Sequence, residues 1–145
     1  MSSLTSYWSQ QEEQIHPQCI VSPTTSQDVS TAVKILSIPI RGETCKFAVR
    51  SGGHTAFAGS ANIENGVTID LRALNEITLS RDRYLVTLGT GQRWGNVYAV
   101  LEKYRIAAAG GRAGGVGIGG STLGGELFGS IVLNSFPLKP IGSCC

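Results

Sequence analysis

Glycine is concentrated in two short segments of this sequence, which limits what the chain can fold into more than any other feature. Of 19 glycines, nine fall between Gly110 and Gly125, in the stretch GGRAGGVGIGGSTLGG. The other segment, VRSGGHTAFAGS, runs from Val49 to Ser60 and places His54 directly after two glycines. Glycine lets main chain approach a ligand closely but costs entropy on folding, so two such segments favour a bound ligand over a purely structural loop.

Length and charge indicate a small globular protein. At 145 residues, of which 15% are charged, the chain is long enough for one domain. The net charge is +2 and the basic residues are scattered. Proteins that follow a nucleic-acid backbone need a basic stripe, so we expect no nucleic-acid partner. We also expect no membrane span, because the apolar C-terminal stretch is far too short to cross a bilayer.

Cysteine and histidine do not suggest a metal site. The four cysteines form no CxxC motif, and the two histidines, His16 and His54, are far apart. Cys19 and Cys45 flank an expected helix and would form a disulfide if the protein is exported, so their pairing stays open. The polar N-terminus lacks the apolar stretch of a secretion signal, and the compartment stays undetermined.

Hydrophobic periodicity predicts an α+β order of elements. Residues 1–16 show no period and are expected to be a loose lead-in. An apolar stripe predicts a helix over 25–36 that Thr25 and Asp28 cap, and a second helix begins at Trp94. Strands are predicted over 46–50, 67–71, 84–88 and 106–109, and a weak alternation at 77–79 forms a hairpin with 84–88. If the strands before the two glycine segments are neighbours, one ligand touches both loops.

The second glycine segment formally satisfies a dinucleotide-binding motif without its context. Gly115, Gly117 and Gly120 match G-x-G-x-x-G, which needs a helix opening at its last glycine and an acidic residue about 20 positions later. The stretch STLGG is a poor helix start, and no acidic residue follows Asn134. The Walker pattern also fails, since no Gly-Lys-Ser/Thr occurs. Consecutive free N–H groups still form an anion-binding nest without either motif.

Four stretches together resemble the N-terminal FAD-binding half of the PCMH-type flavoprotein oxidases, the vanillyl-alcohol oxidase and berberine bridge enzyme group, particularly its fungal FAD-linked oxidoreductases. They are VRSGGH, ANIENGVTIDLRALNEITL, VTLGTGQRWGNVYAVLEKY and AAAGGRAGGVGIGGSTLGG. The resemblance implies a truncated α+β domain with mixed sheets and flanking helices. It divides the chain into the lead-in 1–16, a partial FAD-binding domain at 17–125 and an atypical tail at 126–145.

The resemblance implies FAD as the cofactor and assigns residues to it. In the family, the first loop wraps the FAD pyrophosphate and its imidazole is commonly bonded to the flavin 8α-methyl carbon, which makes His54 the candidate for a covalent flavin bond. The implied cofactor-binding residues of the first segment are Arg50, Ser51, Gly52, Gly53, His54, Thr55, Gly59, Ser60 and Ala61. Those of the second are Gly114, Gly115, Val116, Gly117, Gly119, Gly120, Ser121, Thr122 and Gly125. Ala113 stands where some members carry a second, cysteinyl attachment, so a single histidyl bond is implied.

The implied chemistry is hydride transfer from a small organic metabolite to flavin, followed by reoxidation with oxygen. In this family the substrate-facing sheet and the catalytic base lie in the C-terminal half, so no catalytic residue is assigned here. We interpret residues 126–145, which do not match the family's pattern, as a shifted reading frame, a retained intron or a gene-model error. The alternative function is a non-catalytic FAD-binding remnant or interaction module. An NAD-binding Rossmann enzyme is a third and weaker interpretation.

Overall fold

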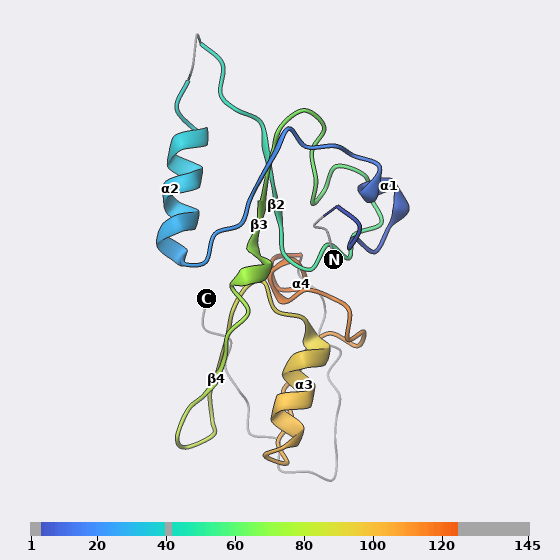
Figure 1. Ribbon diagram of the computed structural model, residues 1–145. Coiled ribbons are helices and arrows are strands. Elements are labelled where there is room, and N and C mark those ends of the chain that lie inside the picture. Colours follow the sequence, from blue (N-terminus) through green and yellow to red (C-terminus); the bar gives the residue numbers. More distant parts are fainter. Residues whose placement is uncertain (1–3, 40–41, 125–145) are drawn as a thin grey trace.

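The fold combines two small sheets with short helices, as seen in a computed structural model that describes residues 4–39 and 42–124 (Figure 1). A parallel sheet has the strand order β1–β3–β2, and an antiparallel hairpin pairs β4 with β5. The strands are β1 Cys19–Val21, β2 Phe47–Arg50, β3 Val67–Asp70, β4 Ile77–Leu79 and β5 Val86–Leu88. The helices are α1 Gln10–Glu13, α2 Ser26–Leu36, α3 Trp94–Glu102 and α4 Ile118–Leu123, with a 3-10 turn at Leu71–Ala73. The expected α+β architecture is confirmed.

The parallel sheet and the hairpin occupy different halves of the molecule. In Figure 1, α2 lies to the left of β2 and β3 and α1 lies to the right, while β4 and α3 extend below them. Because β2 and β3 run parallel with Arg50 opposite Asp70, both strands end at the same edge of the sheet. The loop after β2 therefore leaves the sheet at the edge that faces α4 (Figure 1).

The start of α2 is fixed by a capping box. The Thr25 side chain accepts a hydrogen bond from the Asp28 main-chain N–H at 3.1 Å, and the Asp28 carboxylate accepts one from the Thr25 N–H at 2.9 Å. These bonds satisfy N–H groups that have no partner inside the helix. The expected helix and its cap are confirmed.

The central strand β3 carries the core of the parallel sheet. Thr68 and Ile69 are fully buried, and Asp70 is nearly so. The Thr68 hydroxyl donates to Asn62 Oδ1 at 2.8 Å, so a polar side chain is buried with its hydrogen bond made. Flanked on both sides by parallel neighbours, β3 fixes where the loops after β2 and β3 begin.

A second core lies between α3, α4 and the hairpin. Trp94, Val97 and Leu101 form one buried face of α3, and Ile118 of α4 packs against them. Residues of β4 and β5 cover this cluster from the hairpin. The helix expected from Trp94 and the hairpin between 77–79 and 84–88 are therefore both confirmed.

The strand expected over 106–109 is wrong. The chain turns sharply at Arg105, where φ is +54°, and Ile106 donates its N–H to Leu101 O at 3.3 Å. The segment then runs back along α3, where Tyr98 Oη donates to Gly111 O at 2.7 Å and Gly110 lies against the Trp94 ring. Small residues permit this close passage over an aromatic ring, and no strand of the described chain pairs with the segment.

The loose lead-in expected over 1–16 is also wrong for its described part. Tyr7, Ser9 and Glu12 are buried, and α1 forms within the segment. Glu12 Oε1 accepts hydrogen bonds from the main-chain N–H groups of Ser60 at 3.0 Å and Ala61 at 2.9 Å. A helix of four residues is too short to show a period, so only these distant contacts identify the segment as ordered.

The disulfide left open between Cys19 and Cys45 is not formed, and both thiols are free and exposed. The register places Cys19 on one side of Val67 and Phe47 on the other. Cys19 lies in β1, and Cys45 lies two residues before β2. Because β3 lies between β1 and β2, these two strands are two strand spacings apart, about 9–10 Å. A disulfide needs Cα atoms within about 7 Å.

We predict that Asp28→Asn makes the protein less stable near neutral pH and that the difference shrinks in acid. Hydrogen bonds with Thr25 and Thr24 lower the pKa of Asp28 below its ordinary value. A lowered folded-state pKa contributes stability above the unfolded pKa, and this contribution is lost as the pH falls through the folded value. The measurement is the difference in Tm between wild type and variant at about pH 6 and about pH 3, with Glu102→Gln as an exposed control. An equal difference at both pH values would contradict the prediction.

Candidate functional site

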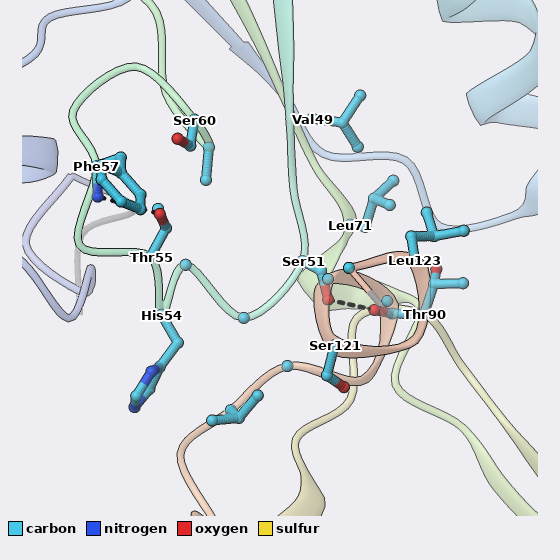
Figure 2. A pocket seen from close by; sticks show the side chains of 18 residues that line it. Val49, Ser51, His54, Thr55, Phe57, Ser60, Leu71, Thr90, Ser121 and Leu123 are labelled. Atoms are coloured by element: carbon cyan, nitrogen blue, oxygen red, sulfur yellow. Dashed lines mark hydrogen bonds between the residues drawn. The ribbon is translucent and has the colours of Figure 1, made fainter. Parts of the chain in front are cut away.

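A pocket of about 700 Å³ lies where the two glycine segments meet. We call residues 51–61 the first loop and residues 110–117, which run into α4, the second loop. Figure 2 shows His54, Thr55, Phe57 and Ser60 on one side of the pocket and Leu71, Thr90 and Leu123 on the other. The two segments meet at one pocket, but not through neighbouring strands as the sequence suggested, because the second segment does not follow a strand.

The two loops touch through their backbones. A Cβ built on Gly52 would lie 2.5 Å from both Cα and N of Gly117, a separation that real side chains do not adopt. The Ser51 hydroxyl donates to Thr90 O at 2.6 Å, and Gly119 donates its N–H to the same carbonyl at 3.3 Å. A side chain at either Gly52 or Gly117 would therefore separate the two walls of the pocket.

Arg93 holds the two loops together at their margin. Its Nη2 donates to Gly52 O at 2.6 Å in the first loop, and its Nη1 donates to Gly115 O at 2.9 Å in the second. Arg93 also pairs with Gly117 in an isolated antiparallel bridge and precedes α3 directly. One planar guanidinium thus joins both loops to the start of α3.

His54 stands on the turn of the first loop. Gly53 has φ +62°, a conformation that side chains rarely adopt, and it turns the chain so that His54 is half-buried at the pocket wall. The imidazole stacks on the Trp8 ring, with centroids 5.1 Å apart and planes at 24°. The sequence predicts a displayed imidazole, and the structure places it beside both loops.

Most of the predicted cofactor-binding residues line this pocket. The lining ones are Ser51, Gly52, Gly53, His54, Thr55, Ser60, Ala61, Val116, Gly117, Gly119, Gly120 and Ser121. Gly59, Gly114, Gly115 and Thr122 are exposed and lie outside the lining, although Gly115 is adjacent to His54. Gly125 lies outside the described residues.

Arg50 lies beneath the first loop rather than in the pocket. Its side chain is fully buried, its Nη2 donates to Ser6 O at 2.8 Å, and its guanidinium lies 3.7 Å over the Tyr7 ring. Asp70 is 4.0 Å from Arg50 and is held more closely, at 2.7 Å, by Arg72. Burial lowers the pKa of Arg50, while hydrogen bonding to Asp70 raises the pKa of Arg72. Arg50 therefore supports the sheet end from which the loop departs.

The second segment contains a helix that the sequence analysis did not expect. α4 begins directly after Gly117 and brings Ile118 into the core against Trp94. Ser121 Oγ accepts from Trp94 Nε1 at 3.0 Å and donates to Ile118 O at 3.1 Å. These tertiary contacts outweigh the poor helix propensity of glycine. The dinucleotide motif still lacks its preceding strand and its acidic residue.

Sequence reasoning missed several side chains of the site. Val49, Phe57, Leu71, Thr90, Leu123 and Gly124 complete the lining. Arg93 had a usable signal, because an arginine stands where a helix normally begins with Ser, Thr, Asp or Asn. Trp8 had none, since its partner is 46 residues away in the sequence. Among the described residues, no helix is long and apolar enough to cross a membrane.

Comparison with known proteins identifies the type of domain. The sequence profile of a family described as "FAD binding domain" matches residues 17–130. The FAD-dependent monooxygenase sdcF of Emericella nidulans is 39% identical over 143 residues, which cover 99% of this chain and 28% of that protein. That alignment extends through residues 126–145, the stretch that the sequence analysis could not match. The chain spans between 18% and 28% of the length of the curated relatives compared with it.

Solved structures give the same type of fold. 6-Hydroxy-D-nicotine oxidase from Arthrobacter nicotinovorans superposes with a TM-score of 0.66 at 26% identity, covering 79% of this chain and 24% of that one. Glucooligosaccharide oxidase from Acremonium strictum superposes with a TM-score of 0.64 at 22% identity, covering 82% of this chain and 24% of that one. Its description includes a 6-S-cysteinyl, 8α-N1-histidyl FAD.

We predict opposite effects on stability for two glycine substitutions. Gly52→Ala would force the Gly117 backbone away and lower the free energy of unfolding by about 1–3 kcal/mol. Gly120→Ala meets no atom within 4 Å and lies inside α4, so it should be neutral or stabilising by up to about 1 kcal/mol. Denaturant unfolding measures both variants, and equal stability of the two would contradict the contact between the loops.

We predict that Arg93→Ala loosens the junction of the loops and costs about 1–2 kcal/mol of unfolding free energy, since two charged hydrogen bonds are lost at a half-exposed position. Arg93→Lys should recover part of this loss, because an ammonium group does not reproduce the planar fork. Arg81→Ala, at an exposed position beyond the end of β4, is the matched control. If Arg93→Ala and Arg81→Ala have the same free energy of unfolding, the two hydrogen bonds of Arg93 do not contribute to stability.

Proposed function

We propose that this chain, which belongs to the FAD-binding domain family of the vanillyl-alcohol oxidase and berberine bridge enzyme type, holds FAD across its two glycine loops through a covalent bond to His54. The observation that carries the proposal is the direct backbone contact between Gly52 and Gly117, with His54 on the wall that they share. The family match gives the cofactor as FAD. The histidyl bond and the binding roles of individual residues are the proposed part.

The loops suit a ligand that carries a diphosphate and a flat ring. Glycine leaves main-chain N–H groups open to phosphate oxygens, where a Cβ would obstruct them. We assign this role to Gly52, Gly53, Gly117 and Gly120, whereas the Gly119 N–H already donates to Thr90 O and this glycine contributes only its bare Cα to the wall. Apolar side chains at Val49, Phe57, Leu71 and Leu123 would cover the less polar parts of the ligand. Bound FAD would provide a flavin ring that accepts a hydride.

His54 supplies the attacking atom of the proposed covalent bond. In its neutral form, an imidazole nitrogen has a lone pair that forms a bond to the flavin 8α carbon. Attachment breaks one C–H bond and one N–H bond, and the two electrons and two protons released are taken up by molecular oxygen as hydrogen peroxide. The description of glucooligosaccharide oxidase includes such a histidyl bond, which supports the same role for His54.

We propose that Ala113 stands where that enzyme has the cysteine of its second flavin bond. We therefore propose one covalent attachment rather than two. We propose that residues 17–125 form the part of the chain that binds FAD, within a family match that continues to residue 130.

Catalysis of a complete oxidoreductase reaction would need groups beyond this pocket. Among the lining residues that the structure describes, His54 carries the one titratable side chain. If His54 is used for flavin attachment, the described lining offers no further general base. This observation favours, as a second candidate, a chain that binds FAD without turning over substrate by itself. Oxidation of a small organic metabolite is proposed for a protein that also contains the substrate-facing part.

We predict that the protein, expressed with ample FAD, is yellow and keeps its flavin fluorescence after acid precipitation. His54→Ala should lose the acid-stable flavin completely, because no other described lining residue offers a nucleophilic nitrogen. His16→Ala is the matched control, since His16 is exposed and lies outside the pocket. Colourless wild-type protein would overturn the proposal of FAD binding. Acid-stable flavin in His54→Ala would overturn only the assignment of the covalent bond.

A further inference from the structure

An exposed tryptophan outside the segment matched by the family packs against the proposed attachment residue. Trp8 precedes residues 17–130 and is 62% exposed, which is unusual for so large an apolar ring. Its ring stacks on the His54 imidazole at a centroid distance of 5.1 Å and an angle of 24°. This is the offset-stacked geometry that aromatic rings favour.

The backbone of Trp8 is fixed beside the first loop. Its N–H donates to Gly53 O at 2.8 Å, one residue before His54. Tyr7 on one side is buried and its Oη donates to Ala61 O at 3.2 Å. Ser9 on the other side is buried and caps α1 through a 3.2 Å bond from Glu12 N. The indole is therefore held in place from both sides, although the ring itself is largely open to solvent.

The imidazole also meets the second loop. A Cβ built on Gly115 would lie 3.4 Å from His54 Cδ2 and 3.5 Å from Nε2, so the imidazole edge lies close to this bare backbone. Gly115 O is itself held by Arg93. In the described part of the chain, no hydrogen bond orients the His54 ring, a role that a carbonyl or carboxylate fulfils at many functional histidines. Among the described contacts, the stacking on Trp8 is therefore the one that orients the imidazole ring.

We propose that Trp8 is a positioning residue for His54, whose indole face holds the imidazole in the orientation needed for bond formation with the flavin. The proposal rests on the proposed function of His54. Without the indole, the imidazole is free to occupy other staggered rotamers, and the fraction aligned for attack falls. The usual strength of an aromatic stack corresponds to an attachment rate about two- to tenfold slower.

The first test compares the rate of flavin attachment in Trp8→Leu, Trp8→Phe and wild type. Purified flavin-free protein is mixed with FAD, and acid-stable fluorescence is followed over time. Trp8→Leu should attach flavin about two- to tenfold more slowly, while Trp8→Phe, which keeps an aromatic face, should recover most of the rate. Tyr84→Leu removes another exposed aromatic ring, beyond the pocket, and should match wild type. Equal rates in Trp8→Leu and wild type would overturn the proposal.

The second test needs no flavin and so separates this proposal from the proposed function. In the NMR spectrum of the flavin-free chain, the imidazole protons of His54 should be shifted upfield by the ring current of Trp8. The chain has two histidines, so His16→Gln leaves one set of signals to assign. The shift should persist in Trp8→Phe and disappear in Trp8→Leu.

Together, the two tests show whether the proposed FAD binding or the positioning role of Trp8 fails. If wild type takes up no flavin, the proposed function fails, and the NMR shift alone decides whether Trp8 orients His54. An imidazole whose signals do not change in Trp8→Leu would overturn the positioning role. A loss of the shift with unchanged thermal stability of Trp8→Leu would support it and exclude a general folding defect.

Discussion

The backbone contact between Gly52 and Gly117 is the constraint on which the arrangement of the pocket depends. It brings a loop from the parallel sheet and a loop from the α3 half of the molecule closer than any side chain would allow. Ser51 and Arg93 secure the contact on either side, through the carbonyls of Thr90, Gly52 and Gly115. A wall shared by two loops thus arises from hydrogen bonds to main chain, which depend little on the identity of neighbouring side chains.

The N-terminal segment supports the first loop from beneath. Tyr7 and Glu12 reach the main chain at Ala61, while Ser6 and the Tyr7 ring contact the guanidinium of Arg50. Burial raises the pKa of Tyr7, so its hydroxyl stays protonated and available as a donor. A buried arginine is costly unless it has polar partners, and here Arg50 donates to Ser6 O at 2.8 Å and Ser6 Oγ at 3.0 Å and lies over the Tyr7 ring. The loop that carries His54 therefore rests on a polar layer.

Local patterns in the sequence were sufficient for some elements and insufficient for others. The Thr25–Asp28 capping box and the face of Trp94, Val97 and Leu101 involve residues three or four apart, so periodicity identified both helices. The contact of Glu12 with Ala61 joins positions 49 apart, and no local pattern reveals it. Glycine content located both walls of the pocket, but α4 forms only because Ile118 and Ser121 contact Trp94. The burial of the Arg50 side chain could not be predicted, because it depends on Ser6 and Tyr7, which lie in a segment without a period.

Two serine side chains of the pocket, Ser51 and Ser121, hold its walls. Ser51 donates to Thr90 O, and Ser121 is bonded to both Trp94 and Ile118. The polar groups left for a ligand are main-chain N–H groups, the imidazole of His54 and the hydroxyls of Thr55, Ser60 and Thr90. Main-chain donors suit phosphate oxygens, since they carry no charge and do not change with pH. A pocket of this composition suits the proposed binding and orientation of a cofactor, and acid–base chemistry on a substrate would have to come from other residues.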